Sequence, residues 1–210
     1  MMTPDEIRAL LGRCRVLPVV TATDVAGTVK LSRTLAASGM HAVEITLRTA
    51  AALEAIRAVK QEVPQMLVAA GTVTNSRELA AAQSAGIDFA VSPGSSAALL
   101  AAARDSGVAM VPGVATPSEI MLGLDHGLDT FKLFPAAAVG GMPLLKALAG
   151  PFPAVSFCPT GGLGPDNFRD YLALPNVVCC GGSWMVAPAL VDAGAWDRIA
   201  TLAAEAMVQD

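Results

Sequence analysis

Charged residues are scarce in this sequence. They make up 15% of the 210 residues, and the 18 acidic side chains outnumber the 14 basic ones, which gives a formal net charge of -4. This acidic balance argues against the basic surface that a nucleic-acid-binding domain needs. The first residues include acidic side chains where a signal peptide starts with basic ones, and glycine, proline or charge interrupts every apolar run before membrane-spanning length. We therefore expect a soluble, cytoplasmic protein.

Histidine and paired cysteine, the usual ligands of zinc, are also scarce. The two histidines, His41 and His126, are far apart and form no H-E-x-x-H motif. No pair of cysteines has the C-x-x-C spacing of a redox or zinc site. The four cysteines are Cys14, Cys158, Cys179 and Cys180. We expect buried thiols in a reducing compartment and no histidine-based metal site.

Apolar and small residues are what the sequence has in abundance. Hydrophobic residues make up 53% of the chain, and 19 residues are glycine. Such a composition suits a fold whose strands are buried on both faces. The length supports a single domain spanning residues 1–210, and the low surface charge points to an oligomer.

Strand-like and helical segments alternate along the whole chain, which is typical of a parallel α/β fold. After an opening helix near Pro4 to Arg13, about eight short apolar runs fit strands, the number that a (β/α)8 barrel needs. They are VLPVV (16–20), AVEITL (42–47), MLVAAG (66–71), FAVSP (89–93), AMVPG (109–113), TFKLF (130–134), VSFCP (155–159) and VVCCG (177–181). We predict a (β/α)8 TIM barrel with an extra N-terminal helix. A doubly wound open sheet is the alternative, but no G-x-G-x-x-G follows the first strand.

Two of these strands carry polar residues at alternate positions. In a barrel, alternate side chains of a strand face the interior, and the active site forms at the carboxyl ends of the strands. With Val43 and its alternates facing the helices, Glu44, Thr46 and Arg48 face inward. The strand at 130–134 places Lys132 and Phe134 inside in the same way.

An interior lysine has two interpretations, catalytic and structural, and the alternation of side chains alone favours them about equally. Burying an ammonium is costly and favours the neutral amine, which can attack a ketone and form an imine with Glu44 as proton shuttle. Alternatively, Lys132 and Glu44 form a structural ion pair. Arg48, further along the Glu44 strand, suits a planar carboxylate because its guanidinium donates two parallel hydrogen bonds.

Glycine-rich segments follow the last two predicted strands. Gly161 and Gly162 follow one of them, and Gly182 and Ser183 follow the other. Barrels often bind phosphate at these two loops, where glycine lets backbone N–H groups approach the anion. Thr72 follows another strand, and Pro93 and the Pro112-Gly113 pair stand at the ends of two more; on spacing alone we interpret them as turn residues. His41 and His126 lie away from the predicted carboxyl ends, and we interpret both as structural or solvated.

The segments VEITLRT, AAGTV, SPG, FKLFPA, FCPTGG and GGSW, in this order and spacing, resemble the 2-keto-3-deoxy-6-phosphogluconate aldolase family. The resemblance extends from about the first strand to the last helix. It implies a (β/α)8 barrel, usually a homotrimer, and a metal-free imine chemistry without a cofactor. Because the segment at 136–139 reads AAAV where relatives often carry a glutamate and an asparagine, the fine substrate preference is open.

The resemblance also assigns roles to the residues of these motifs. It implies that Lys132 forms the Schiff base with the substrate and that Glu44 is the general acid and base. The substrate carboxylate and the pyruvate moiety would contact Arg48, Thr72, Pro93, Phe134 and Thr160. The phosphate would lie against Gly161, Gly162, Gly182 and Ser183.

The expected reaction is cleavage of 2-keto-3-deoxy-6-phosphogluconate to pyruvate and glyceraldehyde 3-phosphate. Its galactonate epimer and unphosphorylated 4-hydroxy-2-oxoglutarate are alternative substrates. A phosphate-binding barrel isomerase or epimerase could share the glycine loops without needing an interior lysine. A non-catalytic phosphosugar-binding barrel is the third possibility.

Overall fold

A computed structural model describes residues 2–208, so residue 1 and residues 209–210 of the predicted 1–210 domain lie outside the described part. Every strand pair in it is parallel. The strands are β1 (Val16–Val20), β2 (Ala42–Thr46), β3 (Leu67–Gly71), β4 (Phe89–Val91), β5 (Met110–Val111), β6 (Gly113–Val114), β7 (Thr130–Leu133), β8 (Ser156–Phe157) and β9 (Cys180–Gly182). Each predicted strand is present, shortened by up to three residues or shifted by one at an end.

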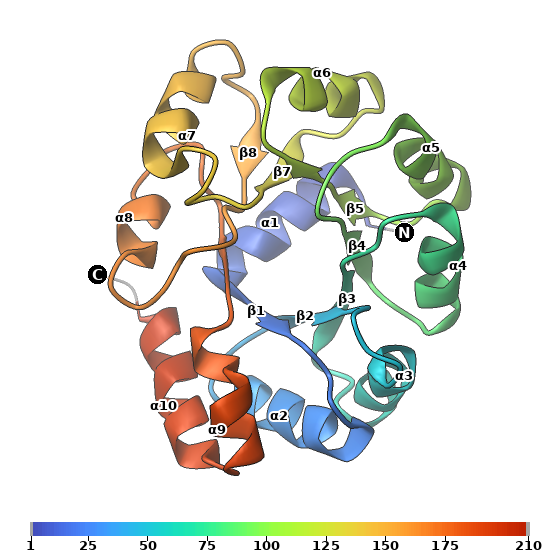
Figure 1. The fold of residues 1–210 in the computed structure, drawn as a ribbon, viewed down its shortest axis with the longest axis vertical. Helices are drawn as coiled ribbons and strands as arrows, with labels where there is room; N and C mark the ends of the chain where they lie inside the picture. Colours follow the sequence, from blue (N-terminus) through green and yellow to red (C-terminus); the bar gives the residue numbers. More distant parts are fainter. Residues whose placement is uncertain (1, 209–210) are drawn as a thin grey trace.

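Helices surround the strands (Figure 1). They are α1 (Pro4–Cys14), α2 (Val25–Ala37), α3 (Ala52–Glu62), α4 (Ser76–Ser84), α5 (Ala97–Ser106), α6 (Pro117–Asp125), α7 (Gly141–Ala149), α8 (Phe168–Leu172), α9 (Pro188–Asp192) and α10 (Trp196–Met207), with a 3-10 turn η1 (Trp184–Val186). The capping residues Asp24, Asn75 and Thr116 each accept a hydrogen bond from a backbone N–H of the first helical turn. These caps explain where α2, α4 and α6 begin.

The strands form a curled parallel sheet in two parts. Within residues 2–208, six strands are joined in the order β5-β4-β3-β2-β1-β9 and three in the order β6-β7-β8. Isolated bridges join Phe157 to Val177 and Thr160 to Gly181, next to β8 and β9. At the other junction, the Lys132 N–H donates to the Pro112 carbonyl at 2.9 Å. A doubly wound sheet reverses its strand order at a switch point, whereas β5 to β1 follow one another without reversal, so that alternative is wrong.

The Pro112-Gly113 pair is part of the sheet, and its interpretation as a turn is wrong. β5 ends at Val111, and β6 resumes at Gly113 and pairs with β7. Proline has no N–H to donate, so it interrupts the ladder for a single residue. A Cβ on Gly113 would lie 2.6 Å from the Gly94 nitrogen, so glycine is needed here for the close approach of the two chains.

The first helix closes one end of the curled sheet, as the prediction of an extra N-terminal helix requires (Figure 1). Thr3 and Glu6 form a capping box at its start. Leu10 and Leu11 of α1 pack into a buried cluster with Leu17 and Phe89 from the sheet. This contact attaches α1 to the sheet, because each Å² of apolar surface removed from water contributes about 25 cal/mol.

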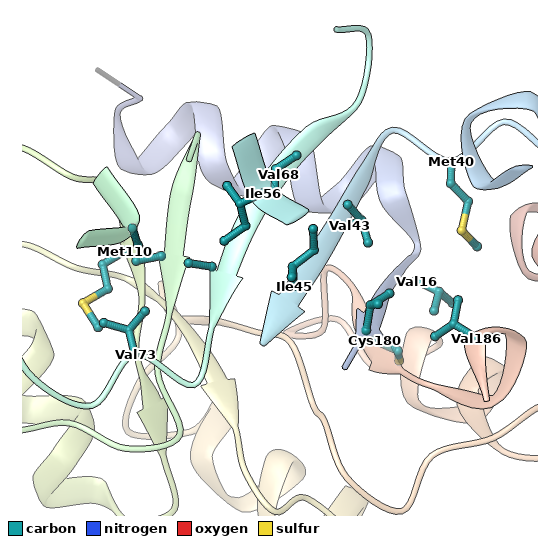
Figure 2. Packing of buried hydrophobic residues seen from close by; sticks show 14 of the residues in the cluster. Val16, Met40, Val43, Ile45, Ile56, Val68, Val73, Met110, Cys180 and Val186 are labelled. Atoms are coloured by element: carbon teal, nitrogen blue, oxygen red, sulfur yellow. The ribbon is translucent and has the colours of Figure 1, made fainter. Parts of the chain in front are cut away.

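The larger hydrophobic cluster lies between the strands and the surrounding helices (Figure 2). Val43 and Ile45 of β2 are fully buried in it with Ile56 of α3, and Leu47 packs against the same cluster. The outward direction predicted for these alternate residues is confirmed, which leaves the other side of β2 for polar residues. No helix within residues 2–208 has the length and apolar character needed to cross a membrane.

The four cysteines are free and buried, as predicted. Burial raises the pKa of the Cys14 thiol to about 12, and burial also raises the pKa values of Cys179 and Cys180. The thiolate is the reactive form, so the thiols of Cys14, Cys179 and Cys180 are poor nucleophiles at neutral pH. They serve as small apolar core residues.

Candidate active site

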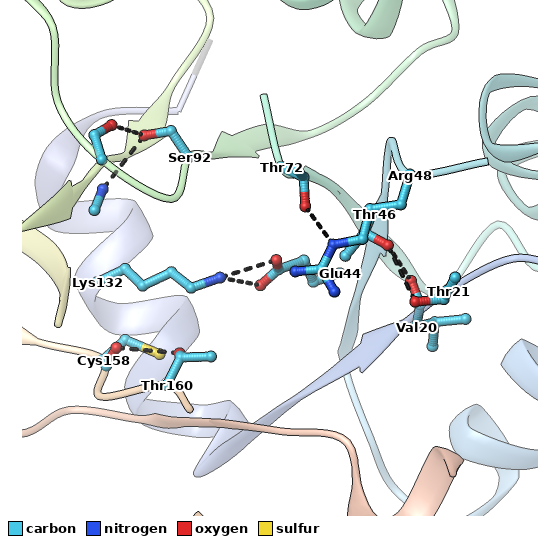
Figure 3. Close-up of polar contacts among 12 residues, drawn as sticks. Val20, Thr21, Glu44, Thr46, Arg48, Thr72, Ser92, Lys132, Cys158 and Thr160 are labelled. Carbon is cyan, nitrogen blue, oxygen red and sulfur yellow. Dashed lines mark hydrogen bonds and ion pairs between the residues drawn. The ribbon is translucent and has the colours of Figure 1, made fainter. Parts of the chain in front are cut away.

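Two charged side chains meet inside the curled sheet (Figure 3). Lys132 extends from β7, and its Nζ lies 3.1 Å from Oε1 and 3.4 Å from Oε2 of Glu44 on β2. Lys132 is 5% exposed and Glu44 is 1% exposed. The inward direction predicted for both residues is confirmed.

Burial makes this contact unusual. Removing an ammonium and a carboxylate from water is expensive, and their mutual attraction offsets the cost only when geometry is good. The Lys132 Nζ donates to both carboxylate oxygens, so a proton transferred between amine and acid moves along an existing hydrogen bond. The contact thus joins a buried amine and a buried carboxyl group directly, and an amine acts as a nucleophile in its neutral form.

Arg48 lies two residues beyond the end of β2 and is exposed. Its Nε donates to the Thr72 hydroxyl at 3.2 Å. Thr72 follows β3 with a φ of 60°, a left-handed backbone conformation that a β-branched residue rarely adopts. Such strain costs of order 1–3 kcal/mol and concentrates at functional sites. Thr72 is therefore more than the turn residue that spacing indicated, because its hydroxyl holds the Arg48 guanidinium.

Thr46, the last residue of β2, contacts the neighbouring strand β1. It is buried, and its hydroxyl donates to the Val20 carbonyl at 3.0 Å. The Thr21 hydroxyl lies 3.4 Å away. Thr46 thus ties β2 to the end of β1 beneath Arg48.

Thr160 lies beside Lys132 at the junction of the two sheets (Figure 3). Its backbone N–H donates to the Leu133 carbonyl at 2.9 Å, and its side chain is mostly buried. A Cβ on Gly181 would lie 2.9 Å from Thr160 Cγ2 and 3.0 Å from Thr160 Cβ. Gly181 was not among the predicted site residues, although it makes the room that Thr160 occupies.

The two glycine loops are adjacent, because the bridge between Thr160 and Gly181 holds their starting points together. Gly161 and Gly162 have φ values of 99° and 80°, which require glycine. Gly182 is buried, and a Cβ there would overlap the ring of Trp184. Its glycine is explained by packing, whereas Ser183 is exposed and accessible to a ligand.

Phe134 and Pro93 complete the surroundings of the lysine. The Phe134 ring centroid lies 5.2 Å from Lys132 Nζ, and Pro93 is half-buried at the end of β4. Sequence reasoning missed Ser92, which is fully buried and donates to the Gly94 carbonyl at 2.8 Å while accepting from the Gly113 N–H at 3.3 Å. These bonds fix the position of Pro93.

Together these residues define an α/β protein with a buried amine and carboxylate at its centre, and with an arginine and two glycine-rich loops at the carboxyl ends of its parallel strands. The family model for KDPG and KHG aldolases matches residues 7–202. The chain belongs to this aldolase family.

The relatives agree with this membership over almost the whole chain. The KHG/KDPG aldolase of Escherichia coli K12 is 50% identical over 192 residues, covering 91% of this chain and 90% of that protein. The 2-dehydro-3-deoxy-phosphogluconate aldolase of Pseudomonas aeruginosa is 49% identical over 202 residues, covering 96% and 92%.

Solved structures show the same fold. The 2-keto-3-deoxy-6-phosphogluconate aldolase of Zymomonas mobilis ZM4 with 3-phosphoglycerate has a TM-score of 0.93 and 43% identity, covering 99% of this chain and 98% of that one. The KDPG aldolase of Legionella pneumophila, with pyruvate captured as a covalent carbinolamine, has a TM-score of 0.93 and 41% identity, covering 97% of each chain.

The buried pair generates a stability prediction. Lys132→Met leaves the Glu44 carboxylate buried without its cation, so we expect the free energy of unfolding to fall by about 3–5 kcal/mol. The double variant Lys132→Met/Glu44→Gln removes both charges and should recover a large part of this loss. Urea unfolding of the three variants and the original chain measures the effect.

The exposed pair Arg57 and Glu54, with an N–O distance of 3.0 Å, is the matched control. Arg57→Met should change the free energy of unfolding by less than about 1 kcal/mol. A loss for Lys132→Met no larger than that of Arg57→Met would contradict the account of the buried pair.

Proposed function

We propose that this chain is a class I aldolase that cleaves 2-keto-3-deoxy-6-phosphogluconate to pyruvate and glyceraldehyde 3-phosphate, with Lys132 as the Schiff-base residue. The observation that carries the proposal is the buried Lys132 amine within hydrogen-bond distance of Glu44. The covalent carbinolamine in the Legionella relative supports it, because a carbinolamine is the direct precursor of an imine.

The first half of the reaction forms the imine. The neutral Lys132 amine attacks the keto carbon of the substrate and gives a carbinolamine. Glu44 donates a proton to the departing hydroxyl, which leaves as water, and the protonated imine remains. The distance of 3.1 Å between Nζ and Oε1 is short enough for this proton to be delivered directly or through one water.

The second half breaks the carbon–carbon bond. The Glu44 carboxylate takes the proton of the carbon-4 hydroxyl, carbons 3 and 4 separate, and the bonding electrons move into the imine to give an enamine. Glyceraldehyde 3-phosphate leaves as the aldehyde. Carbon 3 of the enamine is then protonated, and water hydrolyses the imine to pyruvate and free Lys132. Glu44 thus acts as acid and base in successive steps.

Carboxylate binding is the role we propose for Arg48. Its Nε is engaged by Thr72, which leaves the two terminal guanidinium nitrogens for a bidentate contact with the substrate carboxylate. Thr160, Phe134 and Pro93 would enclose the pyruvate moiety. Fixing the carboxylate aligns the cleaved bond with the imine π system, and such orientation accounts for a large part of many rate accelerations.

Phosphate binding is the role we propose for the paired glycine loops. Backbone N–H groups of Gly161, Gly162 and Gly182, with the Ser183 hydroxyl, would surround the anion. The segment at 136–139 that follows β7 reads AAAV and contributes no charged side chain here. Binding energy from the phosphate would help to orient the distant keto group.

We also propose that the single domain is a closed (β/α)8 barrel in which β5 and β6 act as one strand. The bridges at Thr160 and Phe157 and the hydrogen bond to Pro112 support closure at both junctions. A homotrimer and a cytoplasmic location are part of the same proposal. A metal ion and a cofactor have no role in the imine mechanism.

Among alternative substrates, the 2-keto-3-deoxy-6-phosphogalactonate epimer differs at carbon 4 and 4-hydroxy-2-oxoglutarate lacks the phosphate. The name of the Escherichia coli relative, KHG/KDPG aldolase, supports activity on the unphosphorylated compound as a second candidate. A phosphate-binding isomerase or epimerase, or a non-catalytic phosphosugar-binding barrel, would share the glycine loops but would not require a buried lysine.

Trapping of the imine tests the proposed mechanism. Borohydride added to the protein with pyruvate should reduce the imine and leave a stable adduct on the peptide that contains Lys132, which mass spectrometry locates. Lys132→Met should abolish the adduct and the cleavage activity. Lys146→Met is the matched control, because Lys146 is exposed on α7, and it should leave both unchanged. An adduct on another lysine, or cleavage that survives Lys132→Met, would refute the mechanism.

Substrate choice is tested by Ser183→Ala. We expect the KM for 2-keto-3-deoxy-6-phosphogluconate to rise about tenfold, because the hydroxyl's hydrogen bond to a charged group is lost. The KM for 4-hydroxy-2-oxoglutarate should stay the same, since that substrate has no phosphate. Steady-state kinetics on both compounds decide the matter, and an equal rise for both would contradict the phosphate assignment.

A further inference from the structure

We propose that Gly71 is a positioning residue for Glu44: the missing side chain at the end of β3 creates the space that holds the Glu44 carboxylate against Lys132. This inference deepens the proposed function and rests on it for its catalytic consequence. The geometric part stands on the contacts of β2 and β3 alone.

The register of the two strands brings Glu44 over Gly71. Glu44 is paired with Ala69, so Gly71 lies two residues further along on the same side of the sheet. A Cβ built on Gly71 would lie 2.6 Å from Glu44 Cγ and 2.8 Å from Glu44 Cδ, and closer still to Oε1. Carbon atoms that are not bonded to each other do not approach so closely, so any side chain at position 71 must displace the carboxylate.

Backbone conformation does not explain this glycine. The φ of Gly71 lies outside the left-handed region, and its carbonyl accepts a regular strand hydrogen bond from the Leu47 N–H at 2.8 Å. An alanine could adopt the same backbone. What alanine would lack is room for the Glu44 side chain, and this makes the requirement one of volume.

Displacing Glu44 has a specific consequence. Glu44 is 1% exposed, so its carboxylate cannot move into solvent while the surroundings stay packed. A carboxylate pushed by a methyl group at position 71 loses its two contacts with Lys132 Nζ at 3.1 and 3.4 Å. The expected defect is therefore in proton transfer, whereas Arg48 still binds the substrate carboxylate.

A double-mutant cycle between Gly71→Ala and Glu44→Ala tests the proposal. With Glu44 present, Gly71→Ala should lower kcat for 2-keto-3-deoxy-6-phosphogluconate about a hundredfold, the size of a lost general acid and base. The KM should change by less than about twofold. In the Glu44→Ala background the methyl group meets no carboxylate, so the residual kcat should change by less than about twofold.

Gly94→Ala is the matched control. Gly94 follows β4 at the neighbouring strand end, and a Cβ there would meet nothing within 4 Å. It should leave kcat and KM unchanged. Urea unfolding of all variants gives a second cycle: Gly71→Ala should destabilise the chain that contains Glu44 and leave the Glu44→Ala chain unaffected, even if the single variant folds poorly.

Equal losses from Gly71→Ala in both backgrounds would overturn the proposal, because the glycine would then act independently of Glu44. Full activity of Gly71→Ala would also overturn it. Failure of the proposed function looks different: the original chain would neither cleave the substrate nor form a pyruvate adduct. The unfolding cycle would in that case still report whether Gly71 positions Glu44.

Discussion

The buried contact between Lys132 and Glu44 requires β2 and β7 to face each other inside the curled sheet. Eighty-eight positions separate the two residues in the chain, yet their charged atoms lie 3.1 Å apart with almost no exposure to solvent. Only a sheet that curls back on itself brings β2 and β7 face to face across a common interior. The cost of burying two charges is met by their hydrogen bonds, and the strands around them supply small or apolar side chains.

The two ends of the curled sheet differ in the residues that they carry. At one end α1 packs Leu10 and Leu11 against the sheet and closes it with apolar contacts. At the other end the strands lead into Arg48, Thr72 and the glycine loops, which remain accessible from solvent. The apolar contacts that close the sheet and the accessible loops thus lie at opposite ends of the strands, and a loop at the open end can change without disturbing the closed end.

Much of this arrangement could be predicted from the sequence, because alternation along β2 and β7 determines which side chains face inward. Glu44 and Lys132 were found in this way, and so were the outward-facing Val43 and Ile45. The division of the predicted strand 109–113 at Pro112 into β5 and β6 was missed, although proline cannot donate to a strand ladder. Closed-barrel geometry and subunit assembly stay predictions.

The sequence does not indicate which glycines leave room for the side chains of other residues. The sequence places Gly181 at the end of a strand and Gly182 in a loop, and neither position indicates that the missing side chains make room for Thr160 and Trp184. A glycine has no side chain whose chemistry could indicate its role. For Gly181, the residue for which it makes room is also distant in the sequence. The strained backbone of Thr72 could not be predicted either, because threonine is not a residue typical of a positive φ.

We propose that the Lys132 amine bonds covalently to the keto carbon of the substrate while the Glu44 carboxylate stays within hydrogen-bond distance. A crystal structure of the protein soaked with pyruvate tests it most directly. We expect continuous electron density from Lys132 Nζ to carbon 2 of pyruvate, with the pyruvate carboxylate on Arg48 and the Glu44 carboxylate beside the new bond. Pyruvate bound without a covalent link, or linked to Lys30, Lys60 or Lys146, would contradict it.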